Sequence, residues 1–354
     1  MSAPVPEMDS PPAAPRRRSG RIQLVLMVIG ALLFGIIVWR ANPRQLWATL
    51  SAFGVGLLLF IAIDGMSDIF HAIATRYCFS PENRRAPLLS LLYIRFTVRA
   101  YNFLTPTSGF GGDMVKAMLL RRYAPAHEAA SVVIIDKFTF GLTQFAMAFW
   151  GSALVITQLD IPFEAKVAFW VVSIVLWLGF ASFLLLQRHG WLTPLLERVA
   201  RVIGGDRGRA WIAENLAQLD SRLQTYYRRQ GIDLLRAIFW QALGSATDIG
   251  LAWLFLFFLF GANDWMKAIA IWSLGKWFDM MIFIVPGGLG TQELSRAFVF
   301  QAIHYQWSEG VAYAIVLRTN QLFWSMVGLI THAIELRGAP AADAERASSV
   351  AVGQ

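Results

Sequence analysis

The residues with the clearest chemistry are charged side chains inside otherwise apolar segments. Arg95 and Arg99 lie four residues apart, so on a helix they share one face. Two like charges at this spacing repel each other unless an anion lies between them. Guanidinium groups match phosphate oxygens bidentately, so a phosphate head group is the functional interpretation of this pair. The structural alternative is a carboxylate partner, for which Asp279 is one candidate.

Apolar segments contain seven basic and seven acidic residues. Each such charge costs about 2.5–3.5 kcal/mol at the centre of a bilayer, so we expect them to pair or to line a water-filled cavity. The basic residues are Arg95, Arg99, Lys116, Lys137, Lys276, Arg296 and Arg318. The acidic residues are Asp64, Asp68, Asp113, Asp136, Asp248, Asp279 and Glu293.

We predict two roles for polar groups of this cavity. The residues expected to bind a lipid head group are Arg95, Arg99, Asn102, Lys116, Lys137 and Arg318. The residues expected to act in gating or ion coupling are Asp64, Asp68, Asp113, Asp136, Asp279 and Glu293. Asp113 and Glu293 would repel a phosphate, so we expect them to cap helices or to pair with Lys116 and Arg296. Asp64 and Asp68 form a stripe with His71, which fits a proton relay or, more simply, a partner for the arginines.

Two glycine-rich breaks interrupt apolar runs, LTPTSGFGGD at 104–113 and VPGGLGTQE at 285–293. Proline and clustered glycine end a helix, and backbone freed at membrane depth must lie inside protein or along a cavity. Half-helices that begin there would direct free amides inwards, which favours phosphate; tight turns capped by Asp113 and Thr291 are the simpler alternative. The predicted break residues are Pro106, Gly111, Gly112, Pro286, Gly287, Gly288 and Gly290.

The elements that position these groups are predicted to be membrane helices. Hydrophobic residues make up 56% of the 354 residues and charged residues only 15%, which is too few to cover a soluble surface. Full crossings of about 20 residues are predicted at 22–39, 51–75, 129–157, 167–187, 237–260 and 309–336. The interrupted stretches 88–120 and 268–305 are predicted to be re-entrant helical hairpins, because each half is too short to cross. The predicted class is an all-α polytopic membrane protein.

The basic residues predict the orientation of this protein. Most of the 31 fall in segments that are cytoplasmic if the N-terminus is inside, as expected for a bacterial-type inner membrane protein with both termini cytoplasmic. The two hairpins then enter from opposite faces. At offsets of 180 and 181 residues the chain corresponds with itself at Pro106 and Pro286, Asp113 and Glu293, Lys116 and Arg296, and Lys137 and Arg318. We therefore predict an inverted repeat around a substrate site near the midplane.

Three hydrophilic segments complete the predicted organisation. Residues 1–21 and 337–354 are expected to be disordered tails around a transmembrane domain at 22–336. The loop at 188–236 is basic and amphipathic, which favours a helix on an anionic leaflet or one docked on a partner. The single cysteine excludes an intramolecular disulfide, and we find no metal-binding, nucleotide-binding or catalytic-triad motif. We therefore expect no cofactor, no metal, no nucleic acid partner and no enzymatic activity.

The blocks NFLTPTSGFGGDMVKAMLLRR, AASVVIIDKFTFGL and IVPGGLGTQE carry a resemblance. From about 22 to 336 the chain is similar to the lysylphosphatidylglycerol synthase transmembrane-region family, also called flippase-like domain proteins. The resemblance implies a domain that moves lipids between leaflets. Bifunctional members continue into a soluble aminoacyl-transfer domain, whereas 18 residues follow Leu336 here, so lysyl transfer is not expected.

The functional prediction is translocation of an anionic phospholipid or another envelope lipid through a positively lined cavity between the two hairpins. Transport is expected to be passive or ion-coupled, with membrane lipids as the binding partners. Two alternatives stay open. One is an integral-membrane enzyme that modifies a lipid, and the other is an accessory subunit of an envelope-lipid or polyprenyl-phosphate pathway.

Overall fold

The computed structural model describes residues 43–104, 110–157, 163–189, 225–226, 230–281 and 290–352. Within these ranges the regular elements are α-helices and there is no strand, which confirms the all-helical class. The predicted tail at 1–21, the crossing at 22–39 and most of the loop at 188–236 lie outside the described residues. So do the predicted break residues Pro106, Pro286, Gly287 and Gly288.

Three of the described helices are long and apolar enough to span a membrane, by length and composition. They lie in α2 (Pro43–Tyr77), α5 (Ala126–Ile156) and α8 (Gly231–Phe260), where crossings are predicted at 51–75, 129–157 and 237–260. The protein is therefore a multi-pass membrane protein. The predicted crossings at 167–187 and 309–336 are helical in α6 (Phe163–His189) and α11 (Trp307–Val352). That these two also cross stays a prediction.

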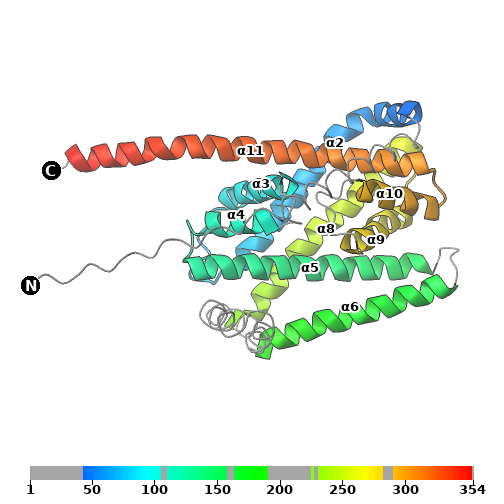
Figure 1. Cartoon of the computed structure of the whole chain (residues 1–354), viewed down its shortest axis with the longest axis horizontal. Helices are drawn as coiled ribbons and strands as arrows, with labels where there is room; N and C mark the ends of the chain where they lie inside the picture. Colours follow the sequence, from blue (N-terminus) through cyan, green and yellow to red (C-terminus); the bar gives the residue numbers. More distant parts are fainter. Residues whose placement is uncertain are drawn as a thin grey trace, which may run out of the picture.

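Each predicted hairpin is a pair of short helices that pack against each other. The first pair is α3 (Leu88–Leu104) and α4 (Phe110–Leu120), and the second is α9 (Trp265–Met281) and α10 (Thr291–Ala302). In Figure 1 the two pairs lie towards opposite ends of the long helix α5, and α2 and α8 cross obliquely between them. The breaks in the apolar runs thus separate helices as predicted, whereas re-entry into a membrane stays a prediction.

Close backbone approach holds the first pair together at Gly112. A Cβ at this position would lie 2.3 Å from Asn102 Oδ1 and 2.6 Å from the carbonyl oxygen of Val98. Any side chain larger than hydrogen would therefore push α4 away from α3. The helices pack this closely because the sequence supplies glycine at the point of contact.

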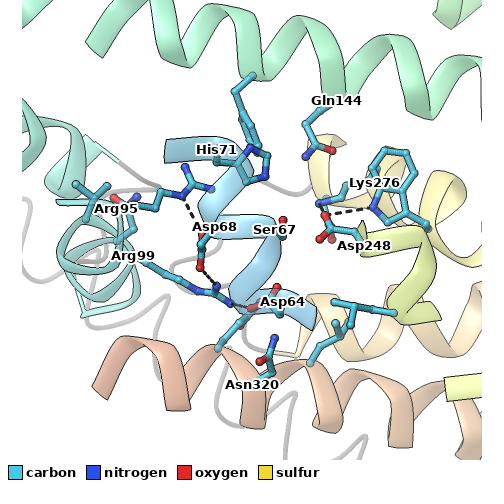
Figure 2. Close-up of a pocket in the computed structure, with 18 of the residues that line it drawn as sticks. Asp64, Ser67, Asp68, His71, Arg95, Arg99, Gln144, Asp248, Lys276 and Asn320 are labelled. Carbon is cyan, nitrogen blue, oxygen red and sulfur yellow. Dashed lines mark hydrogen bonds and ion pairs between the residues drawn. The ribbon is translucent and has the colours of Figure 1, made fainter. Parts of the chain in front are cut away.

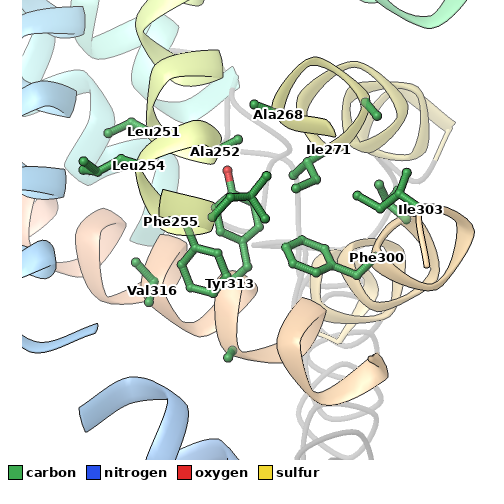
Figure 3. Packing of buried hydrophobic residues seen from close by; sticks show 14 of the residues in the cluster. Leu251, Ala252, Leu254, Phe255, Ala268, Ile271, Phe300, Ile303, Tyr313 and Val316 are labelled. Carbon is green, nitrogen blue, oxygen red and sulfur yellow. The ribbon is translucent and has the colours of Figure 1, made fainter. Parts of the chain in front are cut away.

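An aromatic core fixes the second pair against the long helices. Phe255 of α8, Phe300 of α10 and Tyr313 of α11 have ring centroids 5.0–6.0 Å apart, and Figure 3 shows the three rings between their helices. Such ring pairs contribute about 0.5–1.5 kcal/mol each beyond the burial of their area. A separate core that includes Leu120 and Val132 lies under the first pair. Each pair is thus anchored on its own apolar cluster.

The final helix is longer than the sequence analysis predicts. The structure continues α11 to Val352, through residues 337–352 of the segment 337–354 that is predicted to be a disordered tail. Alanine recurs throughout this segment, and alanine has the highest helix propensity of any residue.

Candidate functional site

The charged residues of the apolar segments gather around one cavity of about 520 Å³. Its described walls come from α2, α3, α4, α5, α8, α9, α10 and α11. Twelve of the fourteen predicted intramembrane charges line it: Asp64, Asp68, Arg95, Arg99, Asp113, Lys116, Asp136, Lys137, Asp248, Lys276, Asp279 and Arg296. A volume of this order is typical of sites for small ligands. The prediction of a charged internal cavity therefore agrees with the geometry.

An ion network closes one side of the cavity. Arg99 contacts Asp64 Oδ2 at 2.8 Å and Asp68 Oδ2 at 2.7 Å, and Arg95 Nε donates to the other oxygen of Asp68 at 3.0 Å. Figure 2 shows Asp68 between the two arginines. The carboxylate that separates the two positive charges is thus Asp68 of α2, as in the simpler interpretation of the polar stripe. Asp279, the other candidate, pairs elsewhere.

A second network lies deeper and joins four helices. Lys116 Nζ of α4 is 2.5 Å from Asp136 Oδ2 of α5. The other oxygen, Asp136 Oδ1, accepts hydrogen bonds from Thr75 at 2.8 Å and from Gln241 Nε2 at 3.1 Å. Gln241 Oε1 contacts His71 Nδ1, and because this oxygen can only accept, the proton of His71 lies on Nδ1. Lys116 is therefore held in a buried network and not presented to the cavity alone.

The two acids that follow the glycine breaks each pair with the next long helix. Lys137 of α5 pairs with Asp113 of α4, and Arg318 Nε of α11 donates to Glu293 Oε1 of α10 at 2.8 Å. The first pair is partly exposed, with side-chain exposures of 49% and 22%. The second is buried beside the cavity, with exposures of 10% and 0%. Glu293 and Arg318 are the two charges among the fourteen that do not line the cavity.

The predicted pairing of Asp113 with Lys116 and of Glu293 with Arg296 is wrong. Lys116 pairs with Asp136, as described, and Arg296 Nη2 lies 2.7 Å from Asp279 of α9. The physical reason is that closer partners lie on the adjoining helices. An acid and a base three residues apart on a short helix each reach across to a neighbouring helix and not to each other.

The cavity lining is formally neutral among the described residues, with six acidic and six basic side chains. The sequence analysis predicts a positive lining, and the structure differs on this point. The difference arises because carboxylates on the neighbouring helices match every base. Asp248 of α8 is the clearest case, since it lies 4.0 Å from Lys276 of α9.

The helix N-termini at the breaks are arranged differently from the predicted phosphate seats. The Gly112 amide of α4 donates to Asn102 Oδ1 at 2.9 Å, so Asn102 satisfies a helix-end donor in the place predicted for a head group. Asp113 lies within the first turn of α4, and its carboxylate pairs with Lys137 of α5. Gly290 is the N-cap residue of α10, with φ 78°, a backbone conformation that favours glycine.

Several cavity residues received no role from sequence reasoning. Among them are Gln144, Trp272, Asn320 and Gln321, all within apolar runs. A neutral polar side chain carries no charge penalty in a hydropathy argument, so this argument identifies the charged residues and not the amides. An amide inside an apolar run was the signal that was available.

The fold and the cavity together define a multi-pass membrane protein with a charged internal site. The family model for the lysylphosphatidylglycerol synthase TM region matches residues 23–328. The chain belongs to this family. The match includes both short-helix pairs and every described residue that lines the cavity. Searches of curated proteins and of solved structures gave no match.

Proposed function

We propose that this protein translocates an envelope lipid with a charged head group, most simply a phospholipid, between the leaflets of its membrane. The head group passes through the cavity while the acyl chains stay in the bilayer. The protein acts in this proposal as a transporter and not as an enzyme, and membrane lipids are its ligands. The cavity carries the proposal, because it combines about 520 Å³ of space with twelve charged lining residues.

Ion pairing alone does not account for such a space. Paired charges stabilise a membrane protein best when they are closely packed, since protein interiors are as dense as organic crystals. A polar cavity forfeits that packing, so its presence supports a ligand that fills it. Family membership supports a role with membrane lipids.

The paired lining suits a head group that stays only briefly. A charged group that enters can take the place of one member of an ion pair, so one charge contact replaces another. The head group then never loses all of its electrostatic partners, which is the large cost of placing a charge in hydrocarbon. Because the pairs re-form afterwards, the site releases its ligand as readily as it binds it.

Reconstitution tests the proposal. The full-length protein is incorporated into liposomes that contain a trace of phospholipid labelled on an acyl chain, and an impermeant quencher reports label that reaches the outer leaflet. We expect faster appearance of inner-leaflet label than in protein-free liposomes. Rates equal to those of protein-free liposomes for both anionic and zwitterionic phospholipids would contradict it. Lipid modification by the protein in detergent, where no leaflets exist, would favour the enzyme alternative.

A further inference from the structure

The ion pair between Lys276 and Asp248 is the most open of the intramembrane pairs that the structure describes. Its nitrogen and oxygen are 4.0 Å apart, beyond hydrogen-bond distance. The other described pairs among the fourteen charges have N–O distances of 3.0 Å or less. Both side chains are about a quarter exposed, 27% and 25%, and both line the cavity. A ligand can therefore reach each charge without breaking a close contact.

Among the described residues Asp248 has one hydrogen bond, and it is long. Trp272 Nε1 donates to Asp248 Oδ2 at 3.4 Å, and the Trp272 ring also lies under the Lys276 ammonium, 5.7 Å from the ring centroid. Trp272 thus contacts both charged side chains at the cavity wall. Figure 2 shows Asp248 and Lys276 on the side of the cavity opposite the arginine network.

Gln144 adds an acceptor to this side of the cavity. Its side chain is 5% exposed, and Nε2 donates to Ser245 Oγ at 3.1 Å. The Ser245 hydroxyl donates to the Gln241 carbonyl oxygen at 2.9 Å, which requires the amide nitrogen of Gln144 to face Ser245. Oε1 then has no hydrogen-bond donor among the described residues. A buried acceptor in this state favours a ligand that brings N–H groups.

The three residues come from helices that pack against one another, α5, α8 and α9. An anionic head group on Lys276 would lie beside the Asp248 carboxylate and be repelled by it. A cationic head group on Asp248 would meet the same repulsion from Lys276. A head group with both charges satisfies both residues, and the formally neutral lining gives no net preference for either sign.

We propose that Lys276, Asp248 and Gln144 form a recognition site for a zwitterionic phospholipid. The phosphate binds Lys276, and the ammonium donates to Asp248 and to Gln144 Oε1. This inference rests on the proposed translocation and names its substrate class. It assigns recognition to the open pair and leaves Arg95 and Arg99 as a closed structural network.

The test compares two acyl-labelled lipids in the same liposomes, phosphatidylethanolamine as the zwitterion and phosphatidylglycerol as the anion. The label is on the acyl chain so that the ammonium keeps its charge. We expect the wild type to move the zwitterion at least about tenfold faster than the anion. This ratio corresponds to a difference of about 1.4 kcal/mol between the two barriers, which the unmatched charge of the anion would cause. The D248N/K276Q variant removes both charges together, and we expect its preference to fall to about twofold or less.

The control is D264N/K267Q, which makes the same chemical changes at an exposed pair at the start of α9. Lys267 and Asp264 are 3.9 Å apart and 40% and 36% exposed, so this variant should keep the wild-type preference. Gln144→Leu provides a second variant that changes no charge, and it should slow the zwitterion alone. Elution of each variant from a sizing column as a single peak shows that it is folded.

Three outcomes would overturn the inference while leaving translocation intact: equal wild-type rates for the two lipids, a faster anion, or an unchanged preference in D248N/K276Q. If the double variant does not fold, the wild-type ratio and Gln144→Leu still decide. Movement of neither lipid by the wild type contradicts the proposed function itself.

Discussion

The arginine network makes a quantitative prediction at Asp68. This carboxylate, with its side chain 3% exposed, contacts both Arg95 and Arg99. In Asp68→Asn, Arg99 keeps Asp64 at 2.8 Å, whereas Arg95 loses its ion-pair partner within the network. Removing one partner of a buried ion pair costs about 3–5 kcal/mol. For a chain of more than 200 residues each kcal/mol shifts the unfolding temperature by about 2 °C, so we expect a fall of roughly 6–10 °C.

The assay is thermal unfolding in detergent, followed by the intrinsic fluorescence of the 14 tryptophans. Asp264→Asn is the matched control, because its pair with Lys267 is exposed and exposed pairs contribute at most about 1 kcal/mol. A second substitution gives the decisive comparison. Arg95→Met removes the base that Asp68→Asn leaves unpaired, so the double variant should recover at least half of the lost unfolding temperature.

Two results would refute this account of the network. One is an unfolding temperature for Asp68→Asn within about 1 °C of the wild type, which would mean that the network contributes little to stability. The other is additivity in the double variant, because groups that share an ion pair must show coupling.

Three further predictions follow from other contacts. Gly112→Ala should destabilise the protein by about 1–3 kcal/mol, because its Cβ would meet Asn102 and the Val98 carbonyl. The control is Gly141→Ala on α5, where a Cβ meets nothing within 4 Å. Equal unfolding temperatures for the two variants would contradict the close approach of α3 and α4 at Gly112. Glu293→Gln should lower the unfolding temperature far more than Asp113→Asn, since Glu293 is fully buried against Arg318 whereas the Asp113 pair is partly exposed. A larger fall for Asp113→Asn would contradict the inference that burial decides how much each ion pair stabilises the protein. Burial raises the pKa of the Cys78 thiol well above its usual range, so this thiol should stay protonated and resist maleimide at pH 7–8 until the protein is denatured; rapid labelling of native protein would show that the site is open.

The amino-acid sequence predicts the location of the site better than its internal contacts. The charge penalty in a bilayer identifies residues that must face inwards, and twelve of those fourteen line the cavity. The glycine breaks predict where helices separate, as between α3 and α4. Periodicity within one helix also places Asp64 and Asp68 on a common face, and the structure brings both to the arginines.

Pairing between helices could not be derived in the same way. Lys116 finds Asp136 on α5 and Arg296 finds Asp279 on α9, and each choice depends on how whole helices pack. The predicted positive lining was wrong for the same reason, because it did not take account of carboxylates such as Asp248 that pair with the bases from the neighbouring helix.

One set of contacts supports the predicted inverted repeat. The pairs Asp113–Lys137 and Glu293–Arg318 occupy corresponding positions at offsets of 180 and 181 residues. In both, the acid follows a glycine break and the base lies on the next long helix. The correspondence stops there. Lys116 of α4 pairs with α5, the helix after its short pair, whereas Arg296 of α10 pairs with α9, the other helix of its own short pair. The repeat itself stays a prediction.

Blocking the cavity tests most directly that lipid head groups pass through it. In a Cys78→Ser background, Leu317→Cys places a thiol on the cavity wall, and Ile330→Cys places one on a 52% exposed position of the same helix. Each is reconstituted, and lipid movement is measured before and after reaction with a bulky thiol reagent. We predict that modification at 317 reduces movement to the protein-free rate and that modification at 330 leaves it unchanged. Undiminished movement after complete modification at 317 would contradict passage through the cavity.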